Sequence, residues 1–573
     1  MTNACKSLIL ICAAALTPAA QAATQEVLIR TRDGATLSAT LALPDPRPAE
    51  RLPALLEFTI YTDPEHHKAT VGEFAARGYA GIVANVRGKG ASPDAIVPYE
   101  HDATDTHAVL DWIGKQPWSD GRVGMLGGSY SGFTAWAAAK RRHPALKAIA
   151  VSAAAIPGQG LPMHNNVFLA ANYAWAFHVT NNKTMDNSVY EDNQRWTRMT
   201  REWFASGRPY RELDAVDGTP NPLLQRWLKH PAFDDYWQSM VPFEKDFARI
   251  DMPVLSITGY YDDGQISALQ YFKDHLKYRR QAEHYLVVGP YDHVGSHARH
   301  KPEVLRDYPI DAVAQMDSQE LKLAFLDHVL RGKPKPELLA QRVNLQVMGA
   351  NQWRRGENLD AMHGIPMRLY FSDQQQDGRF TLSNRAPPAT SKVVHQVDLA
   401  NRNVFHNYHA YPGRIIQGPL EYVTESVFAT TPFDAAATVI GSFTGELSFV
   451  TNKRDFDLGV TVFEAMPDGR LFHLGYALQR ASYAGNPQKR RLLSPGKTQK
   501  LGFATSLVAR QMQPGSRLLV LVDVQKTPMA QVNYGTGKDV SDESVKDAGE
   551  PLRIEILSGS YFEVPLDNAI AKR

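Results

Sequence analysis

The sequence predicts an α/β domain that is interrupted by a helical insertion and followed by an all-β domain. Short apolar runs typical of buried strands alternate with helical patterns in residues 23–155 and again in residues 243–335, which indicates a mostly parallel sheet. Between them, residues 156–242 lose this alternation and are rich in Trp, Tyr, Asn, Arg and Met. Residues 340–573 contain short alternating strands separated by turn signals, which favours a β-sandwich or jelly roll.

The composition is that of an ordinary globular protein. With 573 residues the chain exceeds a single hydrophobic core, so two or three domains are expected. Hydrophobic residues make up 43% of the chain, charged residues 21%, and the formal net charge is +2. This charge balance offers no basic surface for nucleic acid, so nucleic acid is not an expected partner. The sequence leaves the oligomeric state open, a homo-oligomer included.

The N-terminus has the pattern of a secretory signal peptide. Lys6 precedes an apolar run from Leu8 to Leu16, and Ala20-Gln21-Ala22 has the small residues of a cleavage site, so residues 1–22 are the predicted signal. The apolar run is too short for a membrane anchor. We therefore expect a periplasmic or secreted protein without a membrane segment after cleavage. Both cysteines lie in this signal, so the mature chain has no thiol for a disulfide, a thiolate metal site or a nucleophile.

The elements of the first domain follow one another in a diagnostic order. A hairpin over residues 26–43 leads to apolar strands at 54–58 and 80–86, with a helical crossover at 69–77 between them. A helix over 102–113 is followed by the apolar run that begins at Val123. Strand, helix and strand at this spacing form βαβ units, and the whole order is that of an α/β hydrolase. Residues 156–242 are then predicted to be a helical cap over the active site.

Residues 123–132 are predicted to form a nucleophile elbow. Gly127, Gly128 and Gly132 bracket Ser129 between an apolar run and a helix-forming segment, and small neighbours are what a strained strand-to-helix turn needs. Ser129 is therefore the candidate nucleophile. Ser131 is the weaker alternative, because it would lie one position into the helix and away from the apex.

An acid and a base follow in the order expected of this fold. Asp262 comes after the strand at 254–258, and His293 comes after the strand at 284–288, so both would sit at the carboxyl edge of the sheet. A serine needs a base to remove its proton and an acid to orient that base. We predict Ser129, Asp262 and His293 as a triad. Asp263 is the alternative acid, since we expect only one of the two adjacent carboxylates to face the histidine, and Asp292 is expected to be structural.

With these residues assembled, the chain resembles the family of cocaine esterase, α-amino-acid ester hydrolases, cephalosporin acylases and X-Pro dipeptidyl-peptidases. The likeness covers nearly the whole mature chain. Its motifs are Gln116-Pro117-Trp118-Ser119-Asp120-Gly121, Gly127-Gly128-Ser129-Tyr130-Ser131-Gly132, Gly259-Tyr260-Tyr261-Asp262, Gly289-Pro290-Tyr291-Asp292-His293, the arginine-glycine loop at 87–92, and two pieces of the last domain at 347–353 and 455–458.

The resemblance implies a hydrolase domain (residues 23–155 and 243–335), a helical cap (156–242) and a C-terminal jelly roll (340–573). It also implies an oxyanion hole made by the Tyr61 hydroxyl and the Tyr130 backbone N–H. The family usually has proline before that tyrosine, whereas this chain has Ile60. The implied reaction proceeds through an acyl-enzyme and requires no cofactor or metal.

The substrate is predicted less sharply than the reaction. Amino-acid ester hydrolases of the family bind the substrate ammonium with two acids shortly after the catalytic aspartate, and this chain has Asp263-Gly264-Gln265 there. Asp263 can still make one ammonium contact, and Glu191 and Asp192 in the cap are further candidates. We predict an exported serine hydrolase acting on a small ester, amide or peptide, and favour X-Pro dipeptidyl release over a carboxylesterase or a β-lactam or aminoacyl ester acylase. The rival hypothesis is an inactive hydrolase-fold binding protein whose jelly roll holds a carbohydrate.

Overall fold

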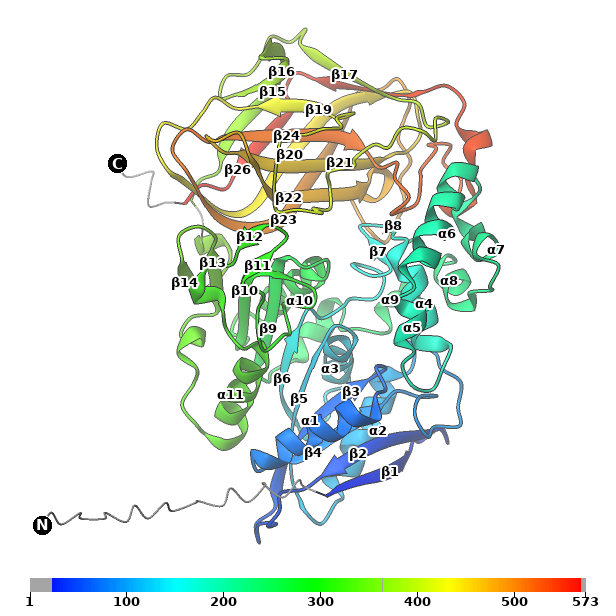
Figure 1. The fold of residues 1–573 in the computed structure, drawn as a ribbon, viewed down its shortest axis with the longest axis vertical. Helices are drawn as coiled ribbons and strands as arrows, with labels where there is room; N and C mark the ends of the chain where they lie inside the picture. The colour runs from blue at the N-terminus through cyan, green and yellow to red at the C-terminus, as the bar shows by residue number, and fades with distance from the viewer. Residues whose placement is uncertain (1–22, 363, 568–573) are drawn as a thin grey trace, which may run out of the picture.

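The protein, seen in a computed structural model that describes residues 23–362 and 364–567, is built on a ten-stranded sheet. The strand order is β1-β2-β4-β3-β5-β6-β9-β10-β13-β14, in the lower half of Figure 1. Strands β4 to β13 of this path are parallel, whereas β1, β2 and β14 pair in antiparallel fashion. This is the predicted α/β-hydrolase sheet, and the predicted fold class is confirmed.

The strands of this sheet are β1 (Thr24–Arg30), β2 (Thr36–Ala42), β3 (Leu52–Thr59), β4 (Ala80–Asn85), β5 (Ser119–Gly128), β6 (Leu146–Ser152), β9 (Val254–Tyr261), β10 (His284–Asp292), β13 (Val343–Val347) and β14 (Gln352–Gly356). Its helices are α1 (Pro64–Ala76), α2 (Asp102–Gly114), α3 (Tyr130–Arg141), α10 (Gln265–Tyr278) and α11 (Ser318–Arg331).

Apolar side chains on both faces of the sheet hold the helices. Leu55 and Leu126 point to one face, where they pack with Phe74 of α1 and with the apolar stripe of α11. The opposite face packs against α2, α3 and α10. Because both faces are covered, the parallel strands consist of nearly continuous buried residues, as expected for a doubly covered sheet. The carboxyl ends of the strands therefore meet at one edge, under the cap.

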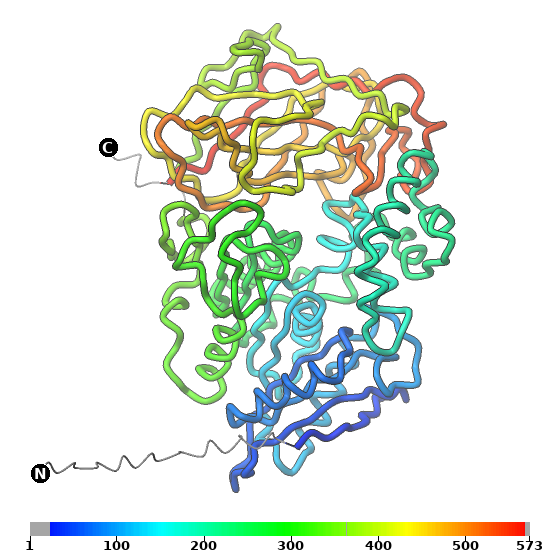
Figure 2. The backbone as a smooth tube through the Cα atoms, viewed as in Figure 1, coloured from blue at the N-terminus to red at the C-terminus, as the bar shows by residue number. Residues whose placement is uncertain are grey.

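The cap is an excursion between β6 and β9, and the tube in Figure 2 shows the chain leaving and re-entering the sheet there. It begins with a short hairpin, β7 (Met163–His164) and β8 (Val167–Phe168), and continues with α4 (Ala171–Thr180), α5 (Asn187–Tyr190), α6 (Asn193–Ser206), α7 (Leu213–Asp217), α8 (Pro222–Trp227) and α9 (Asp235–Gln238). Aromatic rings form most of its core, with the Phe177 and Trp196 rings stacked 6.0 Å apart. Asp217 pairs with Arg195 and fixes α6 to the following turn.

The last domain is an all-β sandwich that lies across the hydrolase domain and the cap (Figure 1). Its strands are β15 (Met367–Gln376), β16 (Arg379–Ser383), β17 (Lys392–Val397), β18 (Ile416–Gln417), β19 (Ser426–Ala429), β20 (Ala437–Thr451), β21 (Asp457–Ala465), β22 (Leu471–Arg480), β23 (Gln499–Met512), β24 (Arg517–Val524), β25 (Leu552–Leu557) and β26 (Tyr561–Val564). Two short strands, β11 (Val304–Leu305) and β12 (Tyr308–Pro309), pair with each other before α11.

Two strands, β13 and β14, belong to a different domain from the one predicted. The alternating run at 343–348 was expected in the jelly roll, but β13 pairs in parallel with β10 and extends the hydrolase sheet. The alternation misleads because all five residues of β13 are buried. Asn344 donates to the carbonyl of Gln341, and Gln346 donates to Asp311, so these polar side chains are buried with partners.

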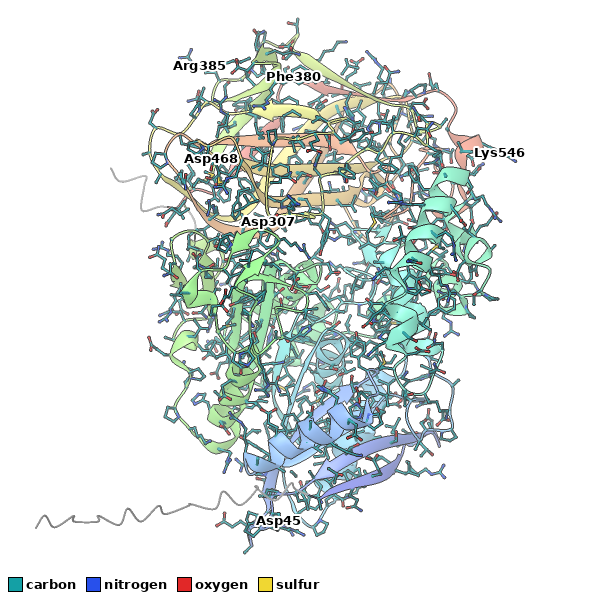
Figure 3. The ribbon with its side chains drawn as sticks, in the orientation of Figure 1. Asp45, Asp307, Phe380, Arg385, Asp468 and Lys546 are labelled. Atoms are coloured by element: carbon teal, nitrogen blue, oxygen red, sulfur yellow. The ribbon has the colours of Figure 1, made fainter. Side chains whose placement is uncertain are left out.

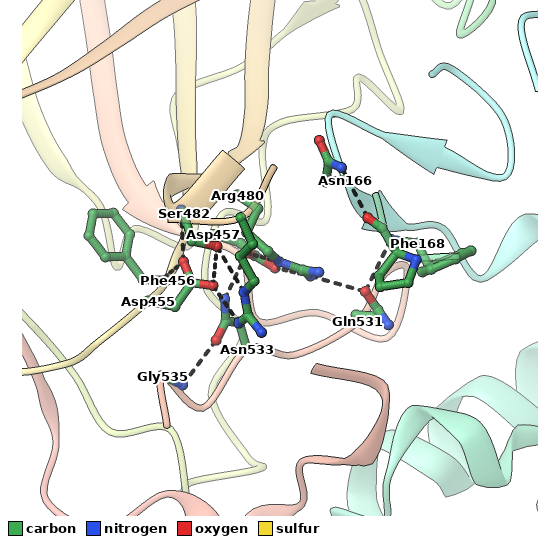
Figure 4. A network of polar contacts seen from close by, with 12 residues as sticks. Asn166, Phe168, Asp455, Phe456, Asp457, Arg480, Ser482, Gln531, Asn533 and Gly535 are labelled. Carbon is green, nitrogen blue, oxygen red and sulfur yellow. Dashed lines mark hydrogen bonds and ion pairs between the residues drawn. The ribbon is translucent and has the colours of Figure 1, made fainter. Parts of the chain in front are cut away.

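A buried polar network joins the sandwich to the cap (Figure 4). The Arg480 guanidinium makes a bidentate pair with Asp457 at 2.8 and 2.9 Å and also donates to Gln531 Oε1 at 3.0 Å. The same oxygen accepts from the backbone N–H of Phe168 in the cap hairpin at 3.2 Å. Both charged residues are almost completely buried. The last domain therefore holds the start of the cap directly.

The sandwich also contacts the hydrolase domain near the triad. The side-chain amide of Gln265, three residues after Asp262, donates to the backbone carbonyl of Leu507 and accepts from its backbone N–H. Farther along the junction, Asp307, labelled in Figure 3, pairs with Arg414. None of the described helices is long and apolar enough to cross a membrane. The predicted signal peptide, residues 1–22, lies outside the described residues.

Candidate active site

Ser129 lies on a strained turn between β5 and α3. Its backbone has φ 56° and ψ −119°, a conformation that a residue other than glycine rarely adopts. The turn is possible because its neighbours lack side chains: a Cβ on Gly127 would lie 2.4 Å from that of Ser131, and one on Gly132 would lie 2.9 Å from that of Ala154. The Ser129 hydroxyl is thus held at the carboxyl edge of the sheet, as an elbow requires.

The structure brings Ser129, His293 and Asp262 together. His293 Nε2 lies 3.0 Å from Ser129 Oγ, and His293 Nδ1 lies 2.9 Å from Asp262 Oδ1. Ser131, the weaker candidate, is buried and donates its hydroxyl to Thr59 Oγ1 at 2.9 Å, away from the histidine. Asp262 Oδ1 therefore orients a base that lies within hydrogen-bond reach of one serine.

Two carboxylates face His293, which corrects the prediction that only one would. Asp263 Oδ1 lies 3.1 Å from His293 Nδ1, nearly as close as Asp262. The two acids differ in surroundings: the Asp262 side chain is fully buried and accepts from Thr258 Oγ1 and the Gly264 N–H, whereas that of Asp263 is 40% exposed. Asp262 is thus the fixed partner. Both carboxylates face one ring nitrogen because the chain turns sharply there, the Gln265 N–H bonding back to the Asp262 carbonyl.

These acids control the charge on the histidine. Burial lowers the pKa of His293, but the hydrogen bonds and charges of Asp262 and Asp263 outweigh it and raise that pKa well above its ordinary value. Burial raises the pKa of Asp263, yet its pairing with His293 leaves the pKa of Asp263 lowered overall. The two carboxylates at Nδ1 therefore stabilise the imidazolium form of His293.

Two donors lie where an oxyanion would form. The Tyr61 hydroxyl lies 3.3 Å from Ser129 Oγ, and Trp175 Nε1 donates to the same hydroxyl at 3.3 Å. As the first residue of α3, Tyr130 has a backbone N–H without a partner inside the helix. Its side chain is anchored away from the site by donating to Asp102 Oδ2 at 2.9 Å. Ile60, in place of the family's proline, is completely buried and leaves Tyr61 in reach of the serine.

A cavity of about 710 Å³ surrounds Ser129. We call its apolar lining the aromatic lobe, which is formed by the loop after β3, the loop before α2 and the cap with Tyr61, Tyr99, Leu161, Leu169, Trp175 and Tyr190. We call its polar lining the polar lobe, which is formed by Glu57, Glu73, His297, Arg299, Gln319 and Lys322. A second cavity of about 240 Å³, under the sandwich, also reaches Asp263.

The comparisons with known proteins agree with this geometry. Residues 33–295 match the model of the X-Pro dipeptidyl-peptidase S15 family, and residues 339–555 match the model of the X-Pro dipeptidyl-peptidase C-terminal non-catalytic domain. The chain belongs to the X-Pro dipeptidyl-peptidase S15 family of serine hydrolases. The predicted family resemblance is therefore confirmed.

Relatives and solved structures extend the match over almost the whole chain. Cocaine esterase of a Rhodococcus strain is 26% identical over 83% of this chain and 85% of its own length. A putative serine esterase of Mycobacterium bovis is 23% identical over 86% of this chain and 88% of its own. A thaumarchaeal aminopeptidase structure shares the fold with TM-score 0.77, 20% identity and coverage of 98% and 99%. An α-amino acid ester hydrolase structure does so with TM-score 0.75, 20% identity and coverage of 98% of both chains.

Two predicted binding residues lie away from the cavity around Ser129. Glu191 and Asp192 are exposed between α5 and α6, and neither lines the cavity around Ser129. The Asp192 carboxylate accepts the backbone N–H of Arg195 at 3.0 Å, so it caps α6. Asp292 is likewise structural, because it accepts the backbone N–H of Gly295 at 2.8 Å. Of the predicted substrate-binding acids, the structure brings only Asp263 to Ser129.

Sequence reasoning missed other cavity residues. Trp175, which no sequence motif marked, lines the cavity, and its indole N–H donates to the Tyr61 hydroxyl. Lys322 and His297 carried no motif, although a lysine in the apolar stripe of a helix that covers the sheet is itself a signal, because lysine is rarely buried without a function or a partner. Their positions become meaningful only when α11 and the loop after β10 are folded against the elbow.

Among the described residues, three groups of histidine and aspartate ligand atoms are close enough to share a cation. In the first, His143 Nδ1 accepts the Ala145 N–H, which places the proton on Nε2 toward Asp111 and leaves no free lone pair for a metal. In the second, Asp523 accepts from His395, His406, two backbone N–H groups and Thr424, so it is fully bonded. The third is the triad with Asp263. The first two are therefore structural.

Proposed function

We propose that the protein cleaves an ester or amide bond through an acyl-enzyme formed on Ser129. The observation that carries this proposal is the hydrogen-bonded line from Asp262 Oδ1 through His293 to Ser129 Oγ, at 2.9 and 3.0 Å, on a strained elbow. A histidine that bonds a buried acid through one ring nitrogen and a serine hydroxyl through the other is the arrangement that activates a serine nucleophile.

Each group then has a role in two half-reactions. His293 takes the proton of Ser129 as the hydroxyl attacks the carbonyl carbon, and it gives that proton to the leaving group. Tyr61 and the Tyr130 N–H stabilise the negative charge on the carbonyl oxygen. In the second half-reaction His293 activates water, which releases the acid and restores Ser129.

The cavity supports an aminoacyl or dipeptidyl acyl group, with X-Pro dipeptidyl release as the favoured reaction. Asp263 lines the cavity beside the triad, and its partly exposed carboxylate can accept a substrate ammonium. The apolar rings of the aromatic lobe suit a prolyl side chain next to the scissile bond. Carboxylester hydrolysis is the second candidate, because the curated relatives are named esterases.

Export to the periplasm or medium is part of the proposal. It rests on the charged, apolar and small-residue order of residues 1–22. A processed N-terminus at Ala23 in protein recovered from the extracytoplasmic fraction is the expected result. An intact Met1 in cytoplasmic protein would contradict it.

Labelling with a fluorophosphonate probe tests the nucleophile. The wild-type chain and Ser131→Ala should label equally, and Ser129→Ala should not label at all. Labelling of the Ser129→Ala variant at the wild-type rate would end the assignment of Ser129 as the nucleophile, whereas a wild-type chain that does not label would favour the inactive binding protein. Turnover of an X-Pro anilide is then compared with that of p-nitrophenyl acyl esters, and activity confined to the esters would replace the peptidase assignment with the carboxylesterase.

A further inference from the structure

The polar lobe begins where one face of the sheet changes from apolar to polar. Leu55, Leu126 and Ala150 point to the face covered by α1 and α11 and pack in its core. Two residues farther along each strand, and so on the same face, stand Glu57, Gly128 and Ser152, the first two of which line the cavity. Beyond the apolar core, the same face of the sheet therefore lines a polar compartment next to the nucleophile elbow.

Lys322 is the buried charge of this compartment. Its side chain extends from α11, is 3% exposed and lines the cavity. The ammonium donates to Ser152 Oγ at 3.4 Å and makes no ion pair among residues 23–362 and 364–567. The backbone carbonyl of Ser152 accepts the Ser129 N–H at 2.9 Å. Ser152 therefore links the Lys322 ammonium to the backbone of the nucleophile. Burial lowers the pKa of Lys322 to about 8, which still leaves it mostly charged at neutral pH.

The other polar groups of the lobe are also short of partners. Glu57 acts on Lys322 through its charge but does not contact it. His297 Nδ1 is buried, has no hydrogen-bond partner among the described residues and would lie 3.0 Å from a Cβ at position 128. Farther out, Glu73 and Arg299 pair with each other between α1 and the loop after β10. The inner lobe therefore presents one ammonium, one carboxylate and one ring nitrogen to whatever occupies it.

The lobe lies on the side of the site where a leaving group must go. The leaving atom receives its proton from His293, so it has to depart next to that ring. The His297 and His293 rings meet edge to face with centroids 5.4 Å apart, which places the polar lobe beside the catalytic base. The aromatic lobe is formed largely by the cap. The apolar part of the acyl group, such as a prolyl ring, fits there, whereas a leaving amine that becomes an ammonium needs polar groups.

We propose that the polar lobe is the leaving-group subsite and that it takes amines carrying a free carboxylate, that is, α-amino acids. The inference rests on the acyl-enzyme function proposed above. The carboxylate binds Lys322, and Glu57 faces the amine. In cleavage the C–N bond breaks and the nitrogen takes the proton held by His293. In the reverse direction the amine lone pair attacks the acyl carbon, the bond from carbon to Ser129 Oγ breaks, and the amine proton passes through His293 to the serine.

Interception of the acyl-enzyme tests this subsite without knowledge of the natural substrate. A p-nitrophenyl acyl ester forms the acyl-enzyme, and alanine or alaninamide competes with water for it at equal concentrations of free-base amine. Alanine should intercept about tenfold more efficiently than alaninamide, since a charge-assisted hydrogen bond to a buried ammonium is the difference. Equal interception by the two amines in the wild-type protein would overturn the proposal.

Variants locate the effect. Lys322→Met, nearly isosteric, should abolish the preference for alanine over alaninamide among the acyl-enzymes that form. Lys301→Met is the matched control, because Lys301 is another buried lysine that bonds to Ser318 Oγ but does not line this cavity, and it should keep the preference. A preference that survives Lys322→Met would also overturn the proposal. If Lys322→Met does not fold, the wild-type comparison still decides, and Glu57→Gln should weaken interception by both amines.

The two proposals fail in different ways. Absence of a Ser129-dependent release of p-nitrophenol would overturn the acyl-enzyme function and the subsite with it. Normal release and hydrolysis without discrimination between alanine and alaninamide would leave the acyl-enzyme function standing and remove only the subsite.

Discussion

Replacement of Asp263 by asparagine should shift the pH dependence of the reaction. Asp263 Oδ1 lies 3.1 Å from His293 Nδ1, and its charge helps to raise the pKa of that histidine. His293 must be neutral to act as a base, so activity appears as the pH rises through this pKa. Without the Asp263 charge the pKa falls, and the acidic limb of the profile moves to lower pH.

The size of the shift follows from the exposure of the carboxylate. A close opposite charge shifts a pKa by about 1–3 units, and the Asp263 side chain is 40% exposed and partly screened by water, so we expect about 1 unit, or about 1.4 kcal/mol. Asp262, fully buried, remains in place as the orienting acid.

The assay is kcat/KM for a p-nitrophenyl acyl ester from pH 4 to pH 9, because its acidic limb reports the free enzyme. Glu191→Gln is the matched control: it removes one exposed cap charge outside the cavity and should leave the limb unchanged. An Asp263→Asn profile that superimposes on the wild-type profile would refute the electrostatic reasoning.

Three further perturbations have defined outcomes. Tyr61→Phe should lower kcat for ester hydrolysis about 100-fold with little change in thermal stability, and an unchanged kcat would remove Tyr61 from the oxyanion hole; Ser131→Ala is its control. Burial raises the pKa of Asp102 to about 8, so the wild-type protein loses stability as the pH rises from the ordinary value of 3.8 toward 8. When the free energy of unfolding is measured by urea titration, the stability of Asp102→Asn relative to the wild type should therefore rise by at most about 1.4 kcal/mol per pH unit over that range. An equal pH dependence of the unfolding free energy in the two proteins would contradict this. Arg480→Met should cost about 3–5 kcal/mol of unfolding free energy because it leaves Asp457 buried and unpaired; Asp457→Asn in the same chain should recover part of the loss, and a loss under 1 kcal/mol would place the pair among weak surface bridges.

The residues that sequence reasoning located share one property: each is fixed by local chemistry. Ser129 stands among glycines that a tight turn demands, and Asp262 and His293 each follow a buried strand, whose end in a parallel sheet is a known edge. The same reasoning failed where strands in two different surroundings have the same alternating sequence pattern. The alternating run at 343–348 was expected in the jelly roll, but β13 is fully buried in the hydrolase sheet, where Asn344 donates to the Gln341 carbonyl.

Lys322 and Glu57 show more clearly which site residues cannot be located from the sequence. Their positions in the chain are separated by most of the hydrolase domain. The position of Lys322 in an apolar stripe marks it as unusual, but nothing in the sequence pairs it with Glu57 or with the elbow. Only the packing of α11 against β5 and β6 brings the lysine behind the elbow. Asp263 is a subtler case, since the sharpness of the turn after β9 decides whether one carboxylate or two reach the imidazole.

The network around Arg480 bears on when the enzyme becomes competent. Gln531, near the end of the chain, accepts from both Arg480 and the backbone of Phe168 at the entrance to the cap. A nascent or truncated chain that stops before residue 531 can form the elbow and the triad strands but lacks the acceptor that holds the cap hairpin. We expect such a chain to have an open, poorly formed acyl pocket. Hydrolytic competence would then be acquired late, only after residue 531 has been made and the cap hairpin is held in place.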